Sequence, residues 1–318
     1  MGASVEGTVT PRGRPLEVGV LLPHFSGALD GGTPRWVDLR AMARAADEVG
    51  FDSIWTFDEL LWRFEGSEPI AFWENWSLLA AVADATSRAR VGTLITCANY
   101  RNPALLARMA ETVDEISDGR LVLGLGAGWS EDQFEMFGFA FDHRFDRFDE
   151  ALQIIHGLLR AGHVDFEGQY HQARDLESTP RGPRPNRIPI LIGGIGPRML
   201  SLAGRYGDEW NAWIPSRSRP AEVPPLREAL DAACGAAGRE PTSLRRSVGI
   251  AVGLGDATLR IGPVDWTPGA IRGTPQQIAT TLRSFADEGI SEVQIALAPF
   301  GTRGIEAFAP VLAALDAV

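Results

Sequence analysis

The chain has few cysteines, few histidines and no long apolar run, and each shortage excludes a class of protein. Only two of its 318 residues are cysteines, Cys97 and Cys234, which stand far apart and in no paired motif. A disulfide framework is therefore not expected, and a reducing compartment fits. The five histidines are scattered without a pair at metal-ligand spacing, so no metal site is predicted. No stretch approaches 18 consecutive apolar residues, which argues against a membrane span.

Basic residues are outnumbered by acidic ones, 30 Lys and Arg against 41 Asp and Glu, which gives a formal net charge of −11. General nucleic-acid binders carry a basic face, so this class is excluded, although a local basic pocket for an anionic ligand is not. Residues 1–15 are small, polar and interrupted by prolines, with no apolar core of signal-peptide length. We therefore expect a disordered tail over residues 1–15 and a single domain over residues 16–318, located in the cytoplasm.

Short apolar runs alternate along the chain with amphipathic helical patterns, which predicts strand–helix units. Eight such runs are present, and they cover residues 18–22, 52–56, 89–96, 120–126, 188–192, 208–213, 245–253 and 291–297. Eight strands each followed by a helix favour an α/β fold of the (β/α)8 TIM-barrel type. Long segments after the fourth and seventh strands, residues 138–187 and 254–273, predict insertions, which on barrels often form lids. An open Rossmann-type sheet is the alternative architecture.

Active sites of barrels are built at the carboxyl-terminal ends of the strands, and this rule selects the candidate side chains. His24 follows the first run, and Asp58 and Glu59 follow the second. Thr96 and Asn99 stand at the end of the third, Gly126 to Trp129 at the end of the fourth, and Asn211 and Trp213 at the end of the sixth.

The fifth run leads into the sequence GGIGPRML, residues 193–200, which predicts a glycine-rich turn before a helix. Gly196 and Pro197 open that helix, whose first N–H groups are free to bind an anion. Phosphate sites in barrels lie after the late strands, so one interpretation is a phosphate site. The other is a tight turn without a ligand.

A second glycine-rich segment, GLGAGW at residues 124–129, resembles a dinucleotide fingerprint, but such strand ends are common. Ser130 and Gln133 have the spacing of a capping box, which predicts that a helix begins here. These glycines are therefore expected to admit a flat ring rather than cradle a pyrophosphate.

The candidates also have ordinary structural interpretations. His24 is either a proton carrier or a polar loop residue, and Asp58 either binds a ligand or caps a loop. For Cys97 a small packing residue is the favoured interpretation, since no partner for a nucleophile is identifiable. Several of the nine tryptophans either line an apolar pocket or pack the insertion loops: Trp55, Trp62, Trp73, Trp76 and Trp129.

Four blocks of sequence resemble the luciferase-like monooxygenase superfamily of flavin- and deazaflavin-dependent barrels. They are AADEVGFDSIWTFDE, the segment from TCANYRNPALLA to GLGAGWSEDQFEMFGF, RFDRFDEALQII and IPILIGGIGPRMLSLAGRYGDEWN. They span most of residues 45–213 in the expected order, while the last third of the chain matches only in layout. The combination of GAGW with IGGIG and LAGRYGDEWN is most similar to the branch that uses coenzyme F420.

The resemblance implies a single barrel domain with a cofactor at its carboxyl-terminal mouth and a small-molecule substrate. The ring of the cofactor is expected across strands two to four, and its phosphate-bearing tail at the turn after strand five. The implied cofactor-binding residues are Asp58, Thr96, Ala127, Gly128, Trp129, Gly193, Gly194, Ile195 and Gly196. Members of the superfamily are commonly dimers, so we expect a homodimer, with a separate flavin or deazaflavin reductase as a possible partner.

Hydride transfer with a deazaflavin needs a group that gives or takes a proton, and the candidate catalytic residues are His24, Glu59 and Asn99. Many deazaflavin members carry a histidine where this chain has Glu59, which would replace it if burial raises its pKa. Some sugar-phosphate-oxidising members carry a glutamate where this chain has Trp129, so that chemistry is not expected. We predict F420-dependent oxidoreduction of an apolar or aromatic substrate. The alternatives are an FMN-dependent monooxygenase that uses O2, and a non-catalytic flavin-binding barrel.

Overall fold

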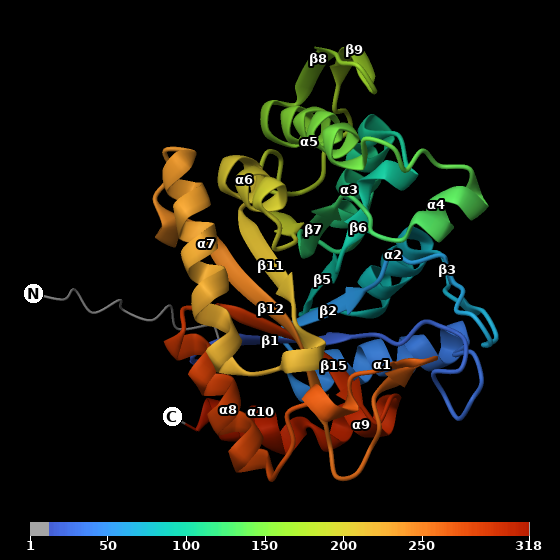
Figure 1. The fold of residues 1–318 in the computed structure, drawn as a ribbon, viewed down its shortest axis with the longest axis vertical. Helices are drawn as coiled ribbons and strands as arrows, with labels where there is room; N and C mark the ends of the chain where they lie inside the picture. Colours follow the sequence, from blue (N-terminus) through green and yellow to red (C-terminus); the bar gives the residue numbers. More distant parts are fainter. Residues whose placement is uncertain (1–12, 318) are drawn as a thin grey trace, which may run out of the picture.

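The structure is a computed structural model that describes residues 13–317, and it shows a barrel of parallel strands surrounded by helices (Figure 1). The barrel strands are β1 (Glu17–Leu21), β2 (Ser53–Thr56), β5 (Arg90–Thr93), β7 (Leu121–Gly126), β10 (Ile190–Gly193), β11 (Glu209–Trp213), β12 (Arg245–Gly253) and β15 (Glu292–Ala298). They pair in the order β10, β11, β12, β15, β1, β2, β5 and β7, and β10 also pairs with β7. This last pair closes the sheet. The predicted (β/α)8 barrel is thereby confirmed, and the open Rossmann-type alternative is wrong.

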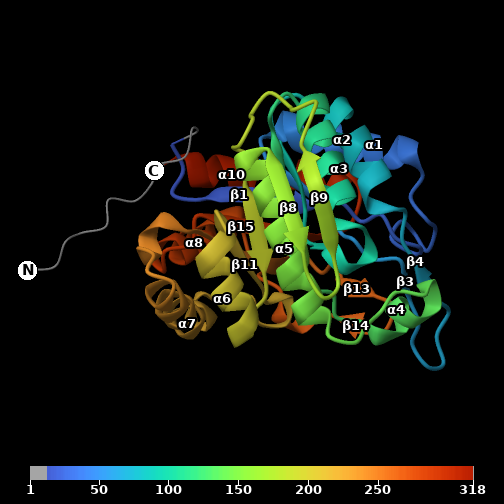
Figure 2. The same ribbon diagram turned by 90° about the horizontal axis from the view of Figure 1, so that it is seen from above.

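Helices follow the strands and cover the outside of the barrel (Figures 1 and 2). They are α1 (Trp36–Val49), α2 (Asn75–Ala85), α3 (Pro103–Ile116), α4 (Glu131–Phe137), α5 (Arg144–Ala161), α6 (Pro197–Tyr206), α7 (Val223–Ala236), α8 (Pro275–Asp287), α9 (Thr302–Ala307) and α10 (Ala309–Asp316). Local sequence sets several of their first residues. The Asn102 side chain accepts hydrogen bonds from two N–H groups at the start of α3, and Thr274 with Gln277 forms a capping box on α8.

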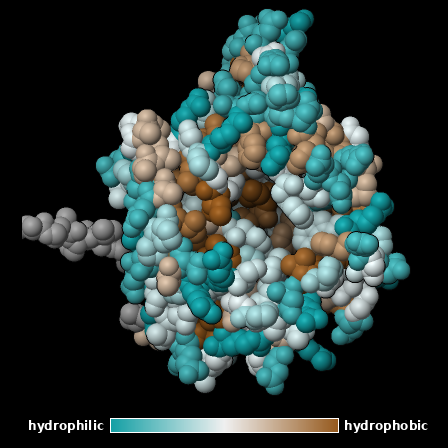
Figure 3. All heavy atoms as spheres, viewed as in Figure 1, coloured by the Kyte–Doolittle hydropathy of each residue, from teal (hydrophilic) through white to brown (hydrophobic). Residues whose placement is uncertain are grey.

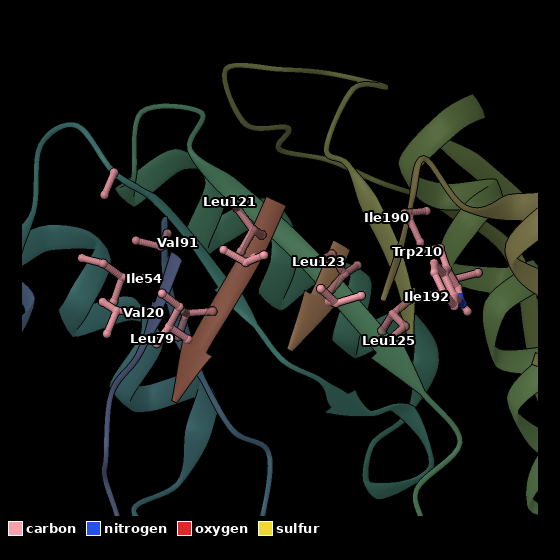
Figure 4. Packing of buried hydrophobic residues seen from close by; sticks show 14 of the residues in the cluster. Val20, Ile54, Leu79, Val91, Leu121, Leu123, Leu125, Ile190, Ile192 and Trp210 are labelled. Atoms are coloured by element: carbon pink, nitrogen blue, oxygen red, sulfur yellow. The ribbon is translucent and has the colours of Figure 1, made fainter. Parts of the chain in front are cut away.

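The main hydrophobic core lies between the barrel and its helices, because alternate residues of each strand point outward. Figure 4 shows part of this layer, in which buried side chains of the barrel strands lie with Leu79 of α2 in one hydrophobic cluster. Its labelled members are Val20, Ile54, Leu79, Val91, Leu121, Leu123, Leu125, Ile190, Ile192 and Trp210. Full burial of each such side chain stabilises the fold by about 1.5–3 kcal/mol, which holds the helices on the strands.

The inside of the barrel is filled by a few large side chains that lie over glycines of neighbouring strands. Trp55 is fully buried, and a Cβ atom added to Gly92 would lie 2.5 Å from its ring. The same relation joins Trp55 to Gly19, Ile95 to Gly126 and Gly193, and Trp213 to Gly249. The side chains that fill the barrel therefore require glycine at these positions.

Short insertions gather at the end of the barrel where the strands have their carboxyl termini. The insertion after β7 includes α4, and the insertion after β12 includes β13 (Arg260–Ile261) and β14 (Val264–Asp265). Both insertions were predicted, whereas a third, with β3 (Leu61–Trp62) and β4 (Ile70–Ala71) after β2, was not. In Figure 2 these elements lie on one side of the molecule.

The predicted hairpin of the first insertion is present but does not belong to this end of the barrel. Its strands are β8 (His163–Glu167) and β9 (Gln172–Glu177), and they pair antiparallel. The hairpin packs on the outer side of α5 (Figure 2). It follows α5 rather than β7, so it does not act as a lid over the carboxyl-terminal mouth.

A cluster of charged side chains closes the opposite, amino-terminal end of the barrel. Arg90 pairs with Glu17, Glu209 and Glu292, and Arg245 pairs with Glu17 at 3.0 Å. Each of these residues is the first of its strand, so the five side chains meet on the barrel axis. Three carboxylates face two guanidinium groups. Burial and the neighbouring carboxylates raise the pKa of Glu292 to about 7, against the opposing effect of Arg90.

Because the pKa of Glu292 is raised in the folded state, the folded protein holds a proton there that the unfolded chain releases at lower pH. The proton bound at Glu292 therefore stabilises the folded state fully below about pH 4.5, and this stabilisation is lost as the pH rises through about 7. We expect Glu292→Gln to remove that loss, so that its stability relative to wild type increases by roughly 1–3 kcal/mol between pH 5 and 8. Urea unfolding at several pH values measures this. Parallel pH profiles for wild type and variant would contradict it, and Glu115→Gln on the exposed face of α3 is the control.

The predicted tail, residues 1–15, lies outside the described residues except for its last three. Among those three, Arg14 is fully buried and donates hydrogen bonds to Asp52 and Asp316. It thus ties the start of the barrel to α10. Within residues 13–317, no helix is both long enough and apolar enough to cross a membrane.

Candidate active site at the carboxyl-terminal mouth of the barrel

A cavity of about 590 Å³ opens at the carboxyl-terminal ends of the barrel strands, a volume typical of small-molecule sites. Figure 3 shows the hollow near the centre of this face, with apolar residues at its bottom and along parts of its rim. Its inner wall is built by the strand ends, through Leu94, Ile95, Thr96, Gly126, Gly193 and Asn211. Its outer wall comes from the insertions, through Trp62, Phe64, Trp129, Val264 and Trp266.

The structure brings together most of the predicted site residues in this cavity. Those that line it are Asp58, Glu59, Thr96, Ala127, Gly128, Trp129, Gly193, Gly194 and Ile195. The other three, His24, Asn99 and Gly196, are not among its lining residues.

His24, a predicted proton carrier, is fully buried beside the cavity. Its Nδ1 lies 3.1 Å from the carbonyl oxygen of Leu22, and its Nε2 lies 3.1 Å from that of Phe57. Burial lowers the pKa of the imidazole to about 4. Because both ring nitrogens face backbone carbonyl oxygens and the side chain does not line the cavity, we do not retain His24 as a catalytic candidate.

Asn99, also a predicted catalytic residue, connects two segments of the mouth instead of facing the cavity. Its Nδ2 donates to the carbonyl oxygens of Ala127 and Arg144, each at 2.9 Å. It therefore positions the turn after β7 against the start of α5.

Asp58 forms a buried, two-point ion pair with Arg101. The distances are 2.6 Å from Nη1 to Oδ2 and 2.9 Å from Nη2 to Oδ1, and Oδ2 also accepts from the N–H of Cys97 at 3.0 Å. Burial raises the pKa of Asp58, while Arg101 and the Cys97 N–H lower it. The carboxylate thus fixes the segment that carries Thr96 and Cys97.

Glu59 is held at the cavity by three N–H groups from different elements. Its Oε1 accepts from Nε1 of Trp129 at 2.8 Å, and its Oε2 accepts from Nε1 of Trp62 at 2.8 Å and Nε2 of Gln133 at 2.5 Å. Burial raises the pKa of Glu59, and the three hydrogen bonds lower it. Glu59 thereby connects the insertion after β2 with the insertion after β7.

The predicted capping box at the start of α4 is wrong, and this network is the reason. Ser130 is the N-cap residue but makes no side-chain cap hydrogen bond. Gln133 turns toward the insertion after β2, where its Oε1 accepts from the N–H groups of Leu60 and Leu61. A long-range partner has replaced the local one.

The turn after β10 is a glycine-rich entrance to α6, as expected, but its glycines have different roles. Gly193 is required by Ile95, whose Cδ1 would lie 2.3 Å from an added Cβ, and Gly194 has a φ of +133°. Gly196, in contrast, has no atom within 4 Å of an added Cβ. It is the N-cap of α6 and provides no side-chain hydrogen bond, so the first amides of α6 have no cap from this residue.

The hydroxyl group of Thr96 begins a short chain of hydrogen bonds. Its Oγ1 donates to Oγ1 of Thr93 at 2.9 Å, which in turn donates to the carbonyl oxygen of Gly124 at 2.9 Å. Because a carbonyl oxygen only accepts, the direction of both hydrogen bonds is fixed. Thr96 is fully buried, so this chain holds the end of the strand in place.

Cys97 behaves as the packing residue that the sequence favoured. It is buried in a cluster with Tyr100 and Phe134, and burial raises the pKa of its thiol well above the usual range. Its Sγ would lie 2.7 Å from a Cβ on Gly128, which has a φ of +80°. A thiol in this environment is a poor nucleophile.

Several lining residues were not predicted, and most are apolar: Phe57, Ile95, Tyr100, Phe145, Met199, Val264 and Trp266. Ile95 directly precedes Thr96, so the strand-end rule places it near the site. The sequence alone does not distinguish an isoleucine that lines a cavity from one that packs in the core. Trp266 belongs to the predicted insertion after β12, and only the fold brings it within 5.5 Å of Trp213, measured between ring centroids.

The chain is similar to known proteins over most of its length. The family model for luciferase-like monooxygenases matches residues 16–258. A protein described as an F420-dependent hydroxymycolic acid dehydrogenase, from Mycobacterium tuberculosis, is 33% identical over 80% of this chain and 68% of its own length. One described as an F420-dependent glucose-6-phosphate dehydrogenase, from Amycolatopsis mediterranei, is 35% identical over 54% of this chain. That match spans only 51% of the relative's length.

Solved structures share the fold at low sequence identity. A structure described as an F420-dependent secondary alcohol dehydrogenase superposes with a TM-score of 0.77 at 20% identity, over 94% of this chain and 99% of that one. An F420-dependent tetrahydromethanopterin reductase from Methanopyrus kandleri gives a TM-score of 0.73 at 17% identity, over 92% and 97% of the two chains.

Proposed function

This chain belongs to the luciferase-like monooxygenase family, and on that premise we propose that it is an oxidoreductase that transfers a hydride between coenzyme F420 and an apolar or aromatic organic substrate. The names of the relatives support F420, since those reported above are all F420-dependent. When bound, the deazaflavin supplies the carbon that gives or accepts the hydride.

The cavity fits the flat ring of a deazaflavin. On its inner wall the sec-butyl side chain of Ile95 packs over Gly126 and Gly193, so this part of the wall presents apolar surface. Thr96, Ala127 and Gly128 lie along the same wall and would hold the ring. The barrel would orient the ring and exclude water from it.

The start of α6 fits an anionic cofactor tail. Gly196 leaves space for a close approach to the backbone, and α6 directs the positive end of its dipole there. A second hollow of about 300 Å³ borders this helix and shares Phe145 with the main cavity. Arg198 and Arg205 line it together with Asp149, and they pair with Asp146 and Asp149 respectively, so a tail that leaves the cavity here would compete with these carboxylates for the two guanidinium groups.

We assign the proton transfer to Glu59. Its Oε2 already accepts two hydrogen bonds and its Oε1 accepts one, so Oε1 has the greater free capacity to carry a proton. In the oxidation of an alcohol the ionised carboxylate would take the hydroxyl proton. In the reduction of a carbonyl the protonated form would donate it. Burial favours the neutral form and brings the group closer to a useful pKa.

The outer wall supports an apolar or aromatic substrate. The rings of Trp62 and Trp129 lie 6.0 Å apart edge to face, and Trp129 is 61% exposed. Trp213 and Trp266 form a second edge-to-face pair. Tryptophan at the position of a catalytic glutamate in some sugar-phosphate-oxidising members also favours a substrate other than a sugar phosphate.

We further propose that the protein acts in the cytoplasm as a homodimer, supplied by a separate deazaflavin reductase when it works as a reductase. Cys97 and Cys234 are buried and unpaired, which is compatible with a reducing compartment.

Titration of the purified protein with F420 and, separately, with FMN tests the cofactor assignment. We expect saturable quenching of cofactor fluorescence with F420 at micromolar concentrations and none with FMN. Tight FMN binding without F420 binding would favour the monooxygenase. F420 binding without hydride transfer to any member of a panel of apolar alcohols and ketones would favour the non-catalytic barrel.

A further inference from the structure

The floor of the cavity contains a polar group that has no role so far. Asn211 on β11 is 3% exposed and lines the cavity beside Gly193, its partner in the neighbouring strand. Its Nδ2 donates to Oγ of Ser247 at 3.1 Å and to Oε1 of Gln294 at 2.9 Å. Both amide hydrogens are therefore occupied below the cavity.

The direction of these hydrogen bonds is set by Ser247. Its hydroxyl donates to the carbonyl oxygen of Trp210 at 3.0 Å, and a carbonyl oxygen only accepts. The Ser247 oxygen must then accept from Asn211, which places the Asn211 nitrogen below the cavity and its Oδ1 toward it. Turning the amides of Asn211 and Gln294 over together would present a donor to the cavity and would give Nε2 of Gln294, which has no partner among the described residues, an acceptor at Asn211. It would, however, take the Ser247 proton from the carbonyl oxygen of Trp210.

The acceptor that results has no partner within the protein. Among residues 13–317 no N–H or O–H group donates to Asn211 Oδ1. The fully buried atoms without a hydrogen-bond partner do not include this oxygen. It therefore keeps accessible surface at the cavity. An oxygen in so apolar a cavity loses free energy on ligand binding unless the ligand brings a donor to it.

We propose that Asn211 is a specificity-determining residue, whose Oδ1 accepts a hydrogen bond from an N–H group at the edge of the bound cofactor ring. Ser247 and Gln294 are positioning residues that hold the amide in this orientation. The ring is the ligand expected at the floor, because the flat apolar wall formed by Ile95 over its glycines lies beside Asn211. The aromatic side chains lie further out. The inference rests on the proposed function, since it takes the deazaflavin as the occupant.

A deazaflavin ring carries one imide N–H between two carbonyl groups, and this group gives a direct test. Two probes are compared by fluorescence titration: 8-hydroxy-5-deazariboflavin and its derivative methylated at that nitrogen. We expect wild type to bind the N–H form about tenfold more tightly than the methylated form. In Asn211→Leu, which keeps the size of the side chain but removes the acceptor, this preference should fall below about threefold.

A purely steric preference would survive these substitutions, and a second variant separates the two causes. Residue 247 does not contact the proposed ring, but Ser247→Ala removes the hydroxyl group that fixes the orientation of the Asn211 amide. It should reduce or reverse the preference while F420 still binds. Thermal unfolding of each variant confirms that it is folded. If Asn211→Leu does not fold, Ser247→Ala carries the test.

The outcomes distinguish this inference from the proposed function. A wild-type protein that binds neither F420 nor 8-hydroxy-5-deazariboflavin would overturn both. A wild-type protein that binds F420 but shows the same preference as Asn211→Leu and Ser247→Ala would overturn the role of Asn211 alone.

Discussion

Glu59→Gln is expected to lower kcat by about 100- to 1000-fold while the affinity for F420 changes by less than about threefold. Glutamine retains the size of the side chain and one oxygen, which can accept either from Trp129 or from Trp62 and Gln133, but it cannot carry a proton. The loss should therefore fall on the chemical step. Pre-steady-state hydride transfer, followed by F420 absorbance with and without substrate, separates that step from binding.

The pH dependence of turnover should differ between the two directions of the reaction. Because burial raises the pKa of Glu59, the ionised form is lost as the pH falls through a value above that of an ordinary glutamate. Alcohol oxidation by wild type should decline on the acidic side of that value, and carbonyl reduction on the alkaline side. Both limbs should disappear in Glu59→Gln.

A matched control lies in the same insertion. Glu68 is exposed between β3 and β4, and Glu68→Gln should leave kcat and its pH profile unchanged. If Glu59→Gln keeps wild-type turnover, Glu59 is not the proton carrier, and its hydrogen bonds to Trp62, Trp129 and Gln133 would have only a structural role.

Asp58→Asn should lower the free energy of unfolding by about 3 kcal/mol. The carboxylate is buried and neutralises Arg101 through two hydrogen bonds, so the variant leaves a partly buried guanidinium with only the more exposed carboxylate of Glu74 as counter-charge. In either orientation the new amide also directs N–H protons toward Arg101, and in one of them toward the N–H of Cys97 as well. Urea unfolding at neutral pH measures the loss.

A double-mutant cycle tests whether the ion pair is the cause. Arg101→Met removes the guanidinium, and in the double variant much of the cost of Asp58→Asn should be recovered, since no uncompensated charge remains. Additive losses in the cycle would contradict the assignment. They would indicate that Asp58 acts mainly through Cys97.

The architecture was accessible from the sequence because its signals are local. Strand–helix alternation and the caps at Asn102 and Thr274 each depend on residues close together in the chain. The insertion after β2 escaped prediction because its strands have only two residues each, among exposed polar and glycine residues. The local pattern at Ser130 misled for the opposite reason: Gln133 binds an insertion some 70 residues away.

The location of the site was predicted better than the roles of its residues. The strand-end rule identified Asp58, Glu59 and Thr96, since this rule follows from the topology of the barrel. It also selected His24, whose burial against two carbonyl groups depends on the return of the chain after β2. The orientation of Asn211 depends on Ser247, which belongs to another strand. No sequence pattern indicates which way an amide points.

The glycines illustrate the same limit. From the sequence, the missing side chain at Gly193 indicates space for a ligand. In the structure the side chain of Ile95 fills this space. Gly196 is the position in this turn where a side chain would meet no protein atom, so a ligand can approach it closely. The expectation that the turn after β10 receives a charged tail therefore depends on Gly196 and the start of α6.

A crystal structure of the protein with F420 tests this arrangement most directly. We predict that the ring lies against Ile95, Ala127 and Gly128, with its imide edge at Asn211, and that a phosphate oxygen contacts the first amides of α6 beyond Gly196. A ring bound outside the barrel mouth, or a tail that leaves α6 uncovered while its phosphate binds elsewhere, would contradict it.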